Sequence, residues 1–334
     1  MNYSLGNTLS RGGSLNADGL SLDLQFATDK SLTARKGPTP TFTRASTATF
    51  VGSDGLIQSA AINAARFDHD PITLACKGLL IEESRTNLVF PSDTLTTQTR
   101  TVTAVAHTLS FYGTGTVVLS GAHVATVTGT GAFPTRTTLT FTPTAGSLTL
   151  TVTGTVTEAQ LEAGAFPTSY IPTVSASVVR SADLCTITGA NFTTVYNEPE
   201  HSLFVEASGM SHAGFPSYLS FDNSTSAEQS TIAGYPSTNR VVCVEVDGGT
   251  TFASIQLPIT LNQSNKMAAA MKLNSFQLSL NGTLGTEDTS GTMATATSLK
   301  IGRSWGSVFL SGTYKQVKVF KKRLANAKLQ ALTT

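Results

Sequence analysis

The sequence has little charge and almost no net charge. Only 13% of its 334 residues are charged, and 22 Lys and Arg against 21 Asp and Glu leave a formal net charge of +1. Ordinary soluble domains carry about 25% charged residues. Without a strong field of one sign, the chain has no general attraction for a phosphate backbone or an anionic membrane surface. We therefore expect neither nucleic-acid binding nor membrane insertion.

Cysteines and long apolar runs are also scarce. The three cysteines, Cys76, Cys185 and Cys243, lie far apart in the sequence and form neither a Cys-x-x-Cys pair for zinc nor an even set for disulfides. We therefore expect these cysteines to be buried and to pack as small hydrophobic side chains. Residues 101–135 lack charged side chains, but Thr, Gly and Ser interrupt every apolar run before the roughly 18 residues that a membrane span needs. Residues 1–14 show no basic stretch before an apolar core, so we do not expect export by the general secretory pathway.

Threonine is abundant in one segment and alternates there with apolar residues. More than a third of residues 94–157 are Thr, and the only charged side chains are Arg100 and Arg136. Between residues 139 and 156, apolar residues alternate with Thr on both sides of a turn at 143–146. This pattern predicts a hairpin with one apolar and one hydroxyl face. Frequent Gly turns and the lack of a helical period favour an antiparallel β-sandwich.

The chain divides into three parts and is predicted to be mainly β. Residues 1–90 show few sustained periods and predict an extended arm or docking region for attachment or oligomerisation. Residues 91–180 form the Thr-rich sandwich, and residues 181–334 a second antiparallel sandwich with a short helix over 324–332. Asn281-Gly282 predicts a tight hairpin turn. The period-two runs of the last part are 203–205, 219–221, 242–246, 276–280 and 314–320.

Four strings of residues recur, in the same order, in a known family. They are RASTATF at 44–50, AARFDHDP at 64–71, GLLIEESRTNL at 78–88 and AQLEAGAFPTSYIP at 159–172. Together they resemble virion proteins of tailed bacteriophages, of the head spike fibre or tail fibre type. The C-terminal third, at 276–282, 299–302 and 312–324, resembles concanavalin A-like, laminin-G-type lectin domains. The resemblance implies an N-terminal arm, a carbohydrate-module-like jelly roll and a concanavalin A-like sandwich.

The same resemblance implies a function in the virion. It implies a homotrimeric fibre or spike whose N-terminal region contacts other virion proteins of the capsid, tail or baseplate, and whose last domain contacts host-surface glycans. The position on the particle, the copy number and the ligand stay open. A purely structural decoration protein without a ligand and a polysaccharide depolymerase are the alternatives.

The chain is not expected to be an enzyme. Glucanases with a lectin-type sandwich carry Glu-x-Asp-x-x-Glu on one strand, because alternate positions face one side and two carboxylates flank the bond that is cleaved. Glu245 and Asp247 match the first two positions, but Thr250 occupies the third. We therefore predict no catalytic residue, and a solvated strand end that turns at Gly248-Gly249.

Two charged clusters in the strings are interpreted as structural. Asp68-His69-Asp70 resembles a metal cluster or part of a triad, but neighbouring residues of a strand point to opposite faces, and the nearby Arg66 offers these acids an ion pair. The charged run at 82–85 is interpreted in the same way, as ion pairs at a module junction.

Candidate glycan-binding residues lie in the loops of the last part. Sugar sites combine an aromatic face with polar partners for the ring hydroxyl groups. Asp222 and Asn223 could offer oxygens to calcium, but two neighbouring residues are too few for its six to eight oxygen ligands, so we expect no metal and no cofactor. The predicted glycan-binding residues are Trp305, Tyr218, Tyr235, Asp222 and Asn223.

Overall fold

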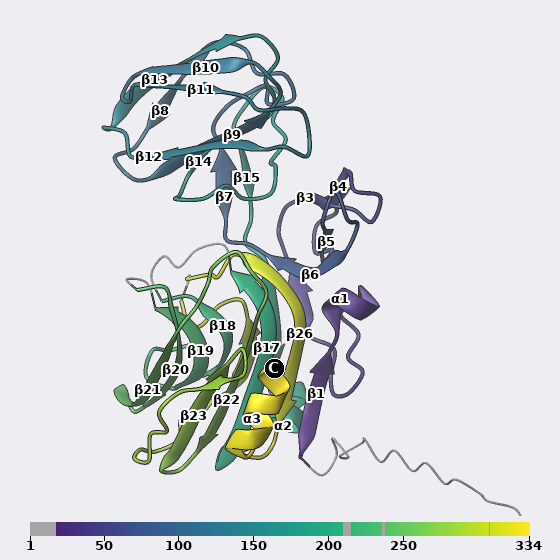
Figure 1. Ribbon diagram of the computed structural model, residues 1–334, viewed down its shortest axis with the longest axis vertical. Coiled ribbons are helices and arrows are strands. Elements are labelled where there is room, and N and C mark those ends of the chain that lie inside the picture. Colours follow the sequence, from purple (N-terminus) through teal and green to yellow (C-terminus); the bar gives the residue numbers. More distant parts are fainter. Residues whose placement is uncertain (1–17, 210–214, 236–237, 307) are drawn as a thin grey trace, which may run out of the picture.

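The computed structural model describes residues 18–209, 215–235, 238–306 and 308–334. Residues 1–17 of the predicted attachment region lie outside the described residues. The chain is mainly β, as predicted, and forms a large and a small β-sandwich joined by a narrow neck, with a hairpin beside the neck (Figure 1).

The large sandwich consists of two antiparallel sheets. The first has the order β24-β23-β22-β17-β26-β6-β5, with β1 also paired to β26, and the second has the order β2-β16-β25-β18-β19-β20-β21. The strands of the first sheet are β1 (Leu20–Leu24), β5 (Phe67–His69), β6 (Cys76–Ile81), β17 (Glu200–Gly209), β22 (Asn265–Lys272), β23 (Ser275–Leu280), β24 (Thr283–Leu284) and β26 (Gly312–Phe320). The strands of the second sheet are β2 (Thr41–Thr43), β16 (Leu184–Thr188), β18 (Ser217–Asp222), β19 (Gln229–Tyr235), β20 (Arg240–Asp247), β21 (Thr250–Pro258) and β25 (Ser298–Ile301).

One apolar core fills the space between these two sheets. Alternation decides which side chains enter it: Val241 and Cys243 of β20 lie in the core, whereas Val242 and Val244 belong to a cluster on the opposite face. Cys185 is wholly buried in the same core. The expectation of small buried hydrophobic side chains is confirmed for these two cysteines, while Cys76 is half-buried. The turn predicted at Asn281-Gly282 joins β23 to β24.

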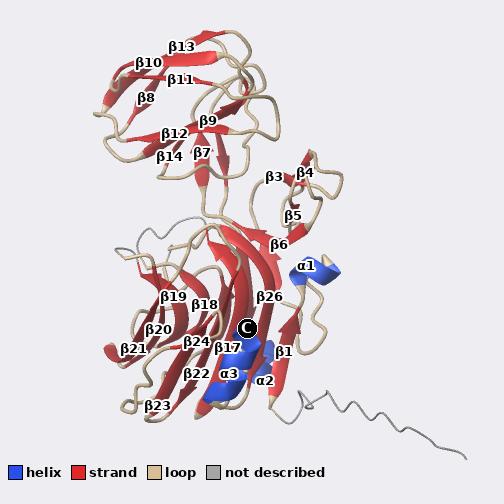
Figure 2. Cartoon of the chain, in the orientation of Figure 1, coloured by secondary structure: helices blue, strands red, loops and turns tan. Residues whose placement is uncertain are grey.

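Three short helices accompany the large sandwich in the described ranges: α1 (Phe26–Asp29), α2 (Gly189–Val195) and α3 (Asn326–Thr333). Helix α3, close to the range predicted, packs Leu329 against Phe204 and Phe320 on the outside of the first sheet. None of these described helices is long and apolar enough to cross a membrane. Figure 2 shows strands and loops alone in the small sandwich.

The small sandwich confirms the β-sandwich predicted for the Thr-rich segment. Leu148 and Leu150 are buried in its core, and on the outer face Thr149 Oγ1 lies 2.9 Å from Thr99 Oγ1. One sheet, of order β11-β10-β13-β8, contains β8 (Gln98–Val102), β10 (Thr116–Gly121), β11 (Ala125–Thr128) and β13 (Gly146–Thr153). The other, of order β12-β9-β14, contains β9 (His107–Tyr112), β12 (Thr137–Phe141) and β14 (Thr157–Ala163).

The hairpin predicted around the turn at 143–146 is wrong. β12 pairs with β9, and β13 pairs with β10 and β8, so the turn crosses from one sheet to the other. The alternation of apolar and hydroxyl residues determines which face of a strand is buried, but it does not determine the neighbouring strand.

The N-terminal region is built into the large sandwich. β1, β2 and β6 pair with β26, β16 and β26, respectively, so residues 20–81 do not form an extended arm; the alternative that the sequence predicted was a docking region. Gly78 permits this: its φ is +102°, and a Cβ there would lie 2.0 Å from the Tyr314 carbonyl oxygen. An attachment or oligomerisation role for residues 1–90 stays a prediction.

Two small pairs of strands lie between the sandwiches, and one of them connects the two. β7 (Arg85–Asn87) pairs with β15 (Val178–Arg180) and forms the neck between them (Figure 1). β3 (Ala48–Val51) and β4 (Ile57–Ala60) form the hairpin beside the neck. The chain therefore passes twice between the sandwiches.

Candidate functional site

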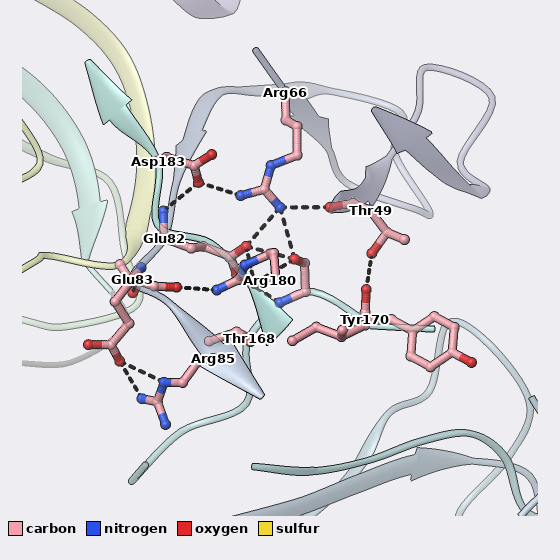
Figure 3. Close-up of polar contacts among 12 residues, drawn as sticks. Thr49, Arg66, Glu82, Glu83, Arg85, Thr168, Tyr170, Arg180 and Asp183 are labelled. Carbon is pink, nitrogen blue, oxygen red and sulfur yellow. Dashed lines mark hydrogen bonds and ion pairs between the residues drawn. The ribbon is translucent and has the colours of Figure 1, made fainter. Parts of the chain in front are cut away.

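A buried cluster of five charged residues, the junction network, lies where the neck meets the large sandwich (Figure 3). Arg66 donates to Glu82 Oε2 at 2.8 Å and to Asp183 Oδ2 at 2.5 Å. Arg180 also donates to Glu82 Oε2, at 2.6 Å. Arg44 donates to Asp183 Oδ1 at 3.0 Å. None of the five is more than 1% exposed, so all the charges depend on one another for compensation.

The junction network joins parts of the chain that are far apart in sequence. The backbone N–H of Ser169, from the end of the small-sandwich region, donates to Glu82 Oε1 at 2.7 Å, and its hydroxyl donates to Glu82 Oε2 at 2.6 Å. Arg66 also donates to the carbonyl oxygen of Thr49 on the hairpin, at 2.8 Å. The four strings that carry the phage resemblance therefore meet here, because Arg44, Arg66, Glu82 and Ser169 each belong to a different one.

Glu82 is ionised at neutral pH. Burial raises the pKa of a carboxyl group, but Arg180, Arg66 and the hydrogen bonds from Ser169 outweigh this and lower the pKa of Glu82 to about 2. The structural ion pair predicted at this module junction is confirmed, with Arg66 and Arg180 as the partners of Glu82. Glu83 forms a separate ion pair with Arg85.

The acids next to Arg66 in sequence have other partners. Asp68 forms an ion pair with Lys77 at 2.6 Å, and Asp70 Oδ1 accepts hydrogen bonds from the backbone and hydroxyl of Thr73 in the following turn. The predicted ion pair between Arg66 and these acids is wrong, because Arg66 pairs with Glu82 and Asp183 instead. Among the described residues, no group of three or more His, Cys, Asp and Glu side chains is placed to hold a metal ion.

Beside the network lies a cleft of about 350 Å³, the junction cleft, which both sandwiches and the hairpin line. Its aromatic wall comes from the small sandwich and the segment that follows it, where the rings of Tyr112 and Phe133 meet edge to face with centroids 5.3 Å apart. Tyr170 and Phe50 extend this wall. The volume lies within the range of about 300 to 1,000 Å³ typical of ligand pockets.

Charged and polar groups line the rest of the junction cleft. Arg136 donates to the Thr168 carbonyl oxygen at 2.6 Å and to Ser110 Oγ at 2.8 Å. These bonds fix the guanidinium group, whose buried Nε has no hydrogen-bond partner among the described residues. The Asp68–Lys77 pair also lines the cleft. An aromatic wall beside fixed donors and acceptors suits a ligand with apolar C–H faces and many hydroxyl groups.

Two of the predicted glycan-binding residues have no surface for a ligand, which corrects that prediction. Tyr218 is wholly buried in the core of the large sandwich, because an irregularity in the pairing between Ser217 and Leu219 turns its side chain inward. Asp222 is wholly buried as well and forms an ion pair with Lys300 at 2.5 Å.

The other three predicted residues are accessible but lie apart. Asn223 accepts hydrogen bonds from the backbone and hydroxyl of Thr225, and so shapes its own turn at the end of β18. Tyr235, half-buried at the end of β19, packs edge to face against Phe215. Trp305, which follows β25, is 41% exposed. None of the five lines the junction cleft.

Glu245 is not at a solvated strand end. The β20–β21 hairpin turns at Gly248-Gly249 as expected, but Glu245 is wholly buried, and its Oε1 accepts hydrogen bonds from Ser230 Oγ at 2.9 Å and the Ala294 N–H at 2.7 Å. Burial raises the pKa of Glu245 to about 8. This carboxyl group is a neutral part of the interior below that pH.

Comparisons with known proteins show only distant, partial likeness. No family model matches the chain, nor does any curated protein. Among solved structures, the CBM40 of Ruminococcus gnavus IT-sialidase bound to α2,3-sialyllactose is 15% identical, with 41% of this chain and 83% of that chain covered and a TM-score of 0.36. The NanB sialidase of Streptococcus pneumoniae is 12% identical, with 45% and 26% covered and a TM-score of 0.37. The binding domain of botulinum neurotoxin DC, in complex with rat synaptotagmin II, is 11% identical, with 46% and 40% covered and a TM-score of 0.37. Function is therefore inferred from the site itself.

Proposed function

We propose that the chain is a non-enzymatic virion protein, a fibre or spike, that binds a host-surface carbohydrate in the junction cleft. The virion assignment rests on the four strings that resemble tailed-phage proteins. The binding assignment rests on the cleft, and the rest of the proposal follows from the two together.

The observation that carries the binding role is that Tyr112, Phe133 and Tyr170 line the same cleft as charged groups. Sugar rings present C–H faces that pack on aromatic rings, and their hydroxyl groups need directional donors and acceptors. The fixed guanidinium of Arg136 and the Asp68–Lys77 pair provide both.

The junction network supports this role because it fixes the walls of the cleft. Glu82 and Ser169 line the cleft and also join the large sandwich to the small one. A site whose walls are already in place loses less freedom when a ligand binds, so more of the contact energy remains as affinity.

The ionisation of Glu82 and the partners of Asp68 fit a cleft that binds a carbohydrate without cleaving it. Glu82 is held ionised by two arginines and is therefore not a proton donor at neutral pH. Asp68 is engaged by Lys77 and by the backbone N–H of Val51. Hydrolysis of a glycosidic bond needs one carboxyl group that donates a proton and a second that is free to act as base or nucleophile.

Glycan-array screening of the full chain, followed by calorimetric titration of the best glycan, tests the binding role. Phe133→Ala should weaken binding by about tenfold or more, since it removes one stacking face. Trp305→Ala, a matched loop aromatic outside the cleft, should bind like the unmodified chain. Equal affinity for the unmodified chain and the two variants would contradict binding in the junction cleft. No binding to any glycan would favour a purely structural decoration protein.

Light scattering tests the fibre assembly. The proposed homotrimer should have a mass near three protomers at micromolar concentration with residues 1–90 present. A clean monomer would contradict it. Reducing ends released from host polysaccharide by the purified chain would instead support the depolymerase alternative.

A further inference from the structure

A second cavity lies beside β7 of the neck. It has a volume of about 310 Å³ and shares no lining residue with the junction cleft. We name it the neck cavity. It is lined by Ser84, Arg85, Thr86, Leu88, Thr101, Val102, Thr103, His107 and Ala163.

Arg85 is held in place at this cavity by the structure around it. Only 8% of the residue is exposed, and its guanidinium lies over the Phe166 ring, 4.9 Å from the centroid. Gly164 makes room for it, because a Cβ there would lie 1.3 Å from Arg85 Nη1. The close fit of ring, glycine and guanidinium gives the group a fixed position and orientation.

One terminal nitrogen of this guanidinium is unused. Nε donates to Glu83 Oε1 at 2.8 Å, and Nη2 donates to the same oxygen. Nη1 is buried and has no hydrogen-bond partner among the described residues. Figure 3 shows the side chain of Arg85 directed away from Arg66 and Arg180, with the dashed contacts to Glu83 on one side only. A buried, unpaired donor on a charged group is costly, so a ligand oxygen there would be strongly favoured.

The free N–H of the Arg85 guanidinium favours an anionic oxygen, because hydrogen bonds between charged groups are shorter and stronger than those between neutral groups. Glu83 already pairs with Arg85, but through Nε and Nη2, so Nη1 remains for a second acceptor. Arg180 of the junction network donates to the backbone carbonyl of Glu83, so a second guanidinium group lies near Arg85.

The remaining lining favours a hydroxylated ligand. Ser84, Thr86, Thr101 and Thr103 bring hydroxyl side chains to the cavity, and His107 adds an imidazole ring whose Nδ1 lies 2.8 Å from the Val105 carbonyl oxygen. We propose that the neck cavity binds a carboxylated sugar, with its carboxylate on Arg85 Nη1 and its ring hydroxyl groups on these side chains. This site is separate from the junction cleft and does not depend on it.

Titration of the full chain with glucuronate, glucose and acetate tests the proposal. Glucuronate should bind at least about tenfold more tightly than glucose, because glucose lacks the carboxylate. It should also bind more tightly than acetate, because acetate lacks the hydroxyl groups. Equal affinities for glucuronate and glucose would overturn the proposed contact between the carboxylate and Arg85. Equal affinities for glucuronate and acetate would overturn the proposed contacts to the hydroxyl groups of the sugar ring.

Two variants should change the affinity for glucuronate in opposite directions. Arg85→Lys keeps the charge but loses the fixed fork, and should weaken glucuronate binding by about tenfold or more. Glu83→Gln removes the competing carboxylate and should strengthen binding several-fold, which keeps the test decisive if Arg85→Lys does not fold. Trp305→Ala should bind like the unmodified chain. Unchanged or weaker binding by Glu83→Gln would overturn the proposal, whatever the outcome at the junction cleft.

Discussion

Replacing Glu82 with Gln tests whether the junction network holds the modules together. The substitution leaves Arg66 and Arg180 buried, with Asp183 as the nearest remaining carboxylate. Removing one partner of a buried ion pair costs about 3–5 kcal/mol, because the other charge stays buried without compensation. Since domains are stable by only about 5–15 kcal/mol, we expect a large loss of stability.

The pH dependence of the free energy of unfolding gives an independent value for the contribution of Glu82. The pKa of Glu82 falls from 4.5 to about 2 in the folded protein. At roughly 1.4 kcal/mol for each unit of pKa, this difference corresponds to about 3–4 kcal/mol of stability. Because the folded-state pKa is lowered, the contribution is complete above pH 4.5 and is lost as the pH falls from 4.5 toward 2. The Gln variant lacks this acid-dependent term.

Urea unfolding followed by circular dichroism measures the loss of stability in Glu82→Gln at pH 7. The same experiment at points between pH 4.5 and 3 measures how the stability of the unmodified chain depends on pH. Lys315→Ala is the control, since it breaks a half-exposed pair with Glu206 that should contribute about 1 kcal/mol or less. Loss of less than about 1 kcal/mol in Glu82→Gln at pH 7 would refute the coupling described here.

Two further substitutions probe the large sandwich. Glu245→Gln should raise the thermal midpoint at pH 8 but not at pH 4: the folded-state pKa of Glu245 is raised to about 8, so the unmodified chain loses stability as the pH rises from 4.5 toward 8. A midpoint difference that does not depend on pH would contradict this. Gly78→Ala should destabilise the chain by roughly 2 kcal/mol or more, because the new Cβ would meet the Tyr314 carbonyl oxygen; urea unfolding with an unchanged midpoint would show that β6 can move away from β26.

Local patterns in the sequence predicted local features of the fold. The Thr alternation around Leu148 and Leu150 correctly separated a buried face from a hydroxyl face, and Asn281-Gly282 marked a real turn. These features depend on neighbouring residues alone, since side chains of a strand alternate with period two.

Pairing between distant segments was not predictable in this way. Leu20 lies opposite Phe320, so the N-terminal strand β1 pairs with a strand that comes 300 residues later. Two of the five predicted binding residues, Tyr218 and Asp222, are buried for the same reason. An irregularity in β18 turns Tyr218 inward, and Lys300, on another strand, covers Asp222.

The junction cleft was missed although part of its sequence was in view. Tyr170 belongs to the string at 159–172 that carried the phage resemblance, but Phe133 and Arg136 lie in the Thr-rich segment. The hairpin and the large sandwich supply further lining residues. Loop composition indicates aromatic candidates, whereas only the folded chain brings three separate parts to one cleft.

The most direct measurement is nuclear magnetic resonance of the full chain with labelled Tyr and Phe rings, titrated with the best glycan from the array. Carbohydrate binding in the junction cleft predicts that the ring signals of Tyr112, Phe133 and Tyr170 shift together and saturate at the calorimetric affinity. Saturating shifts confined to rings outside the cleft, such as Tyr235 at the end of β19, would contradict the account.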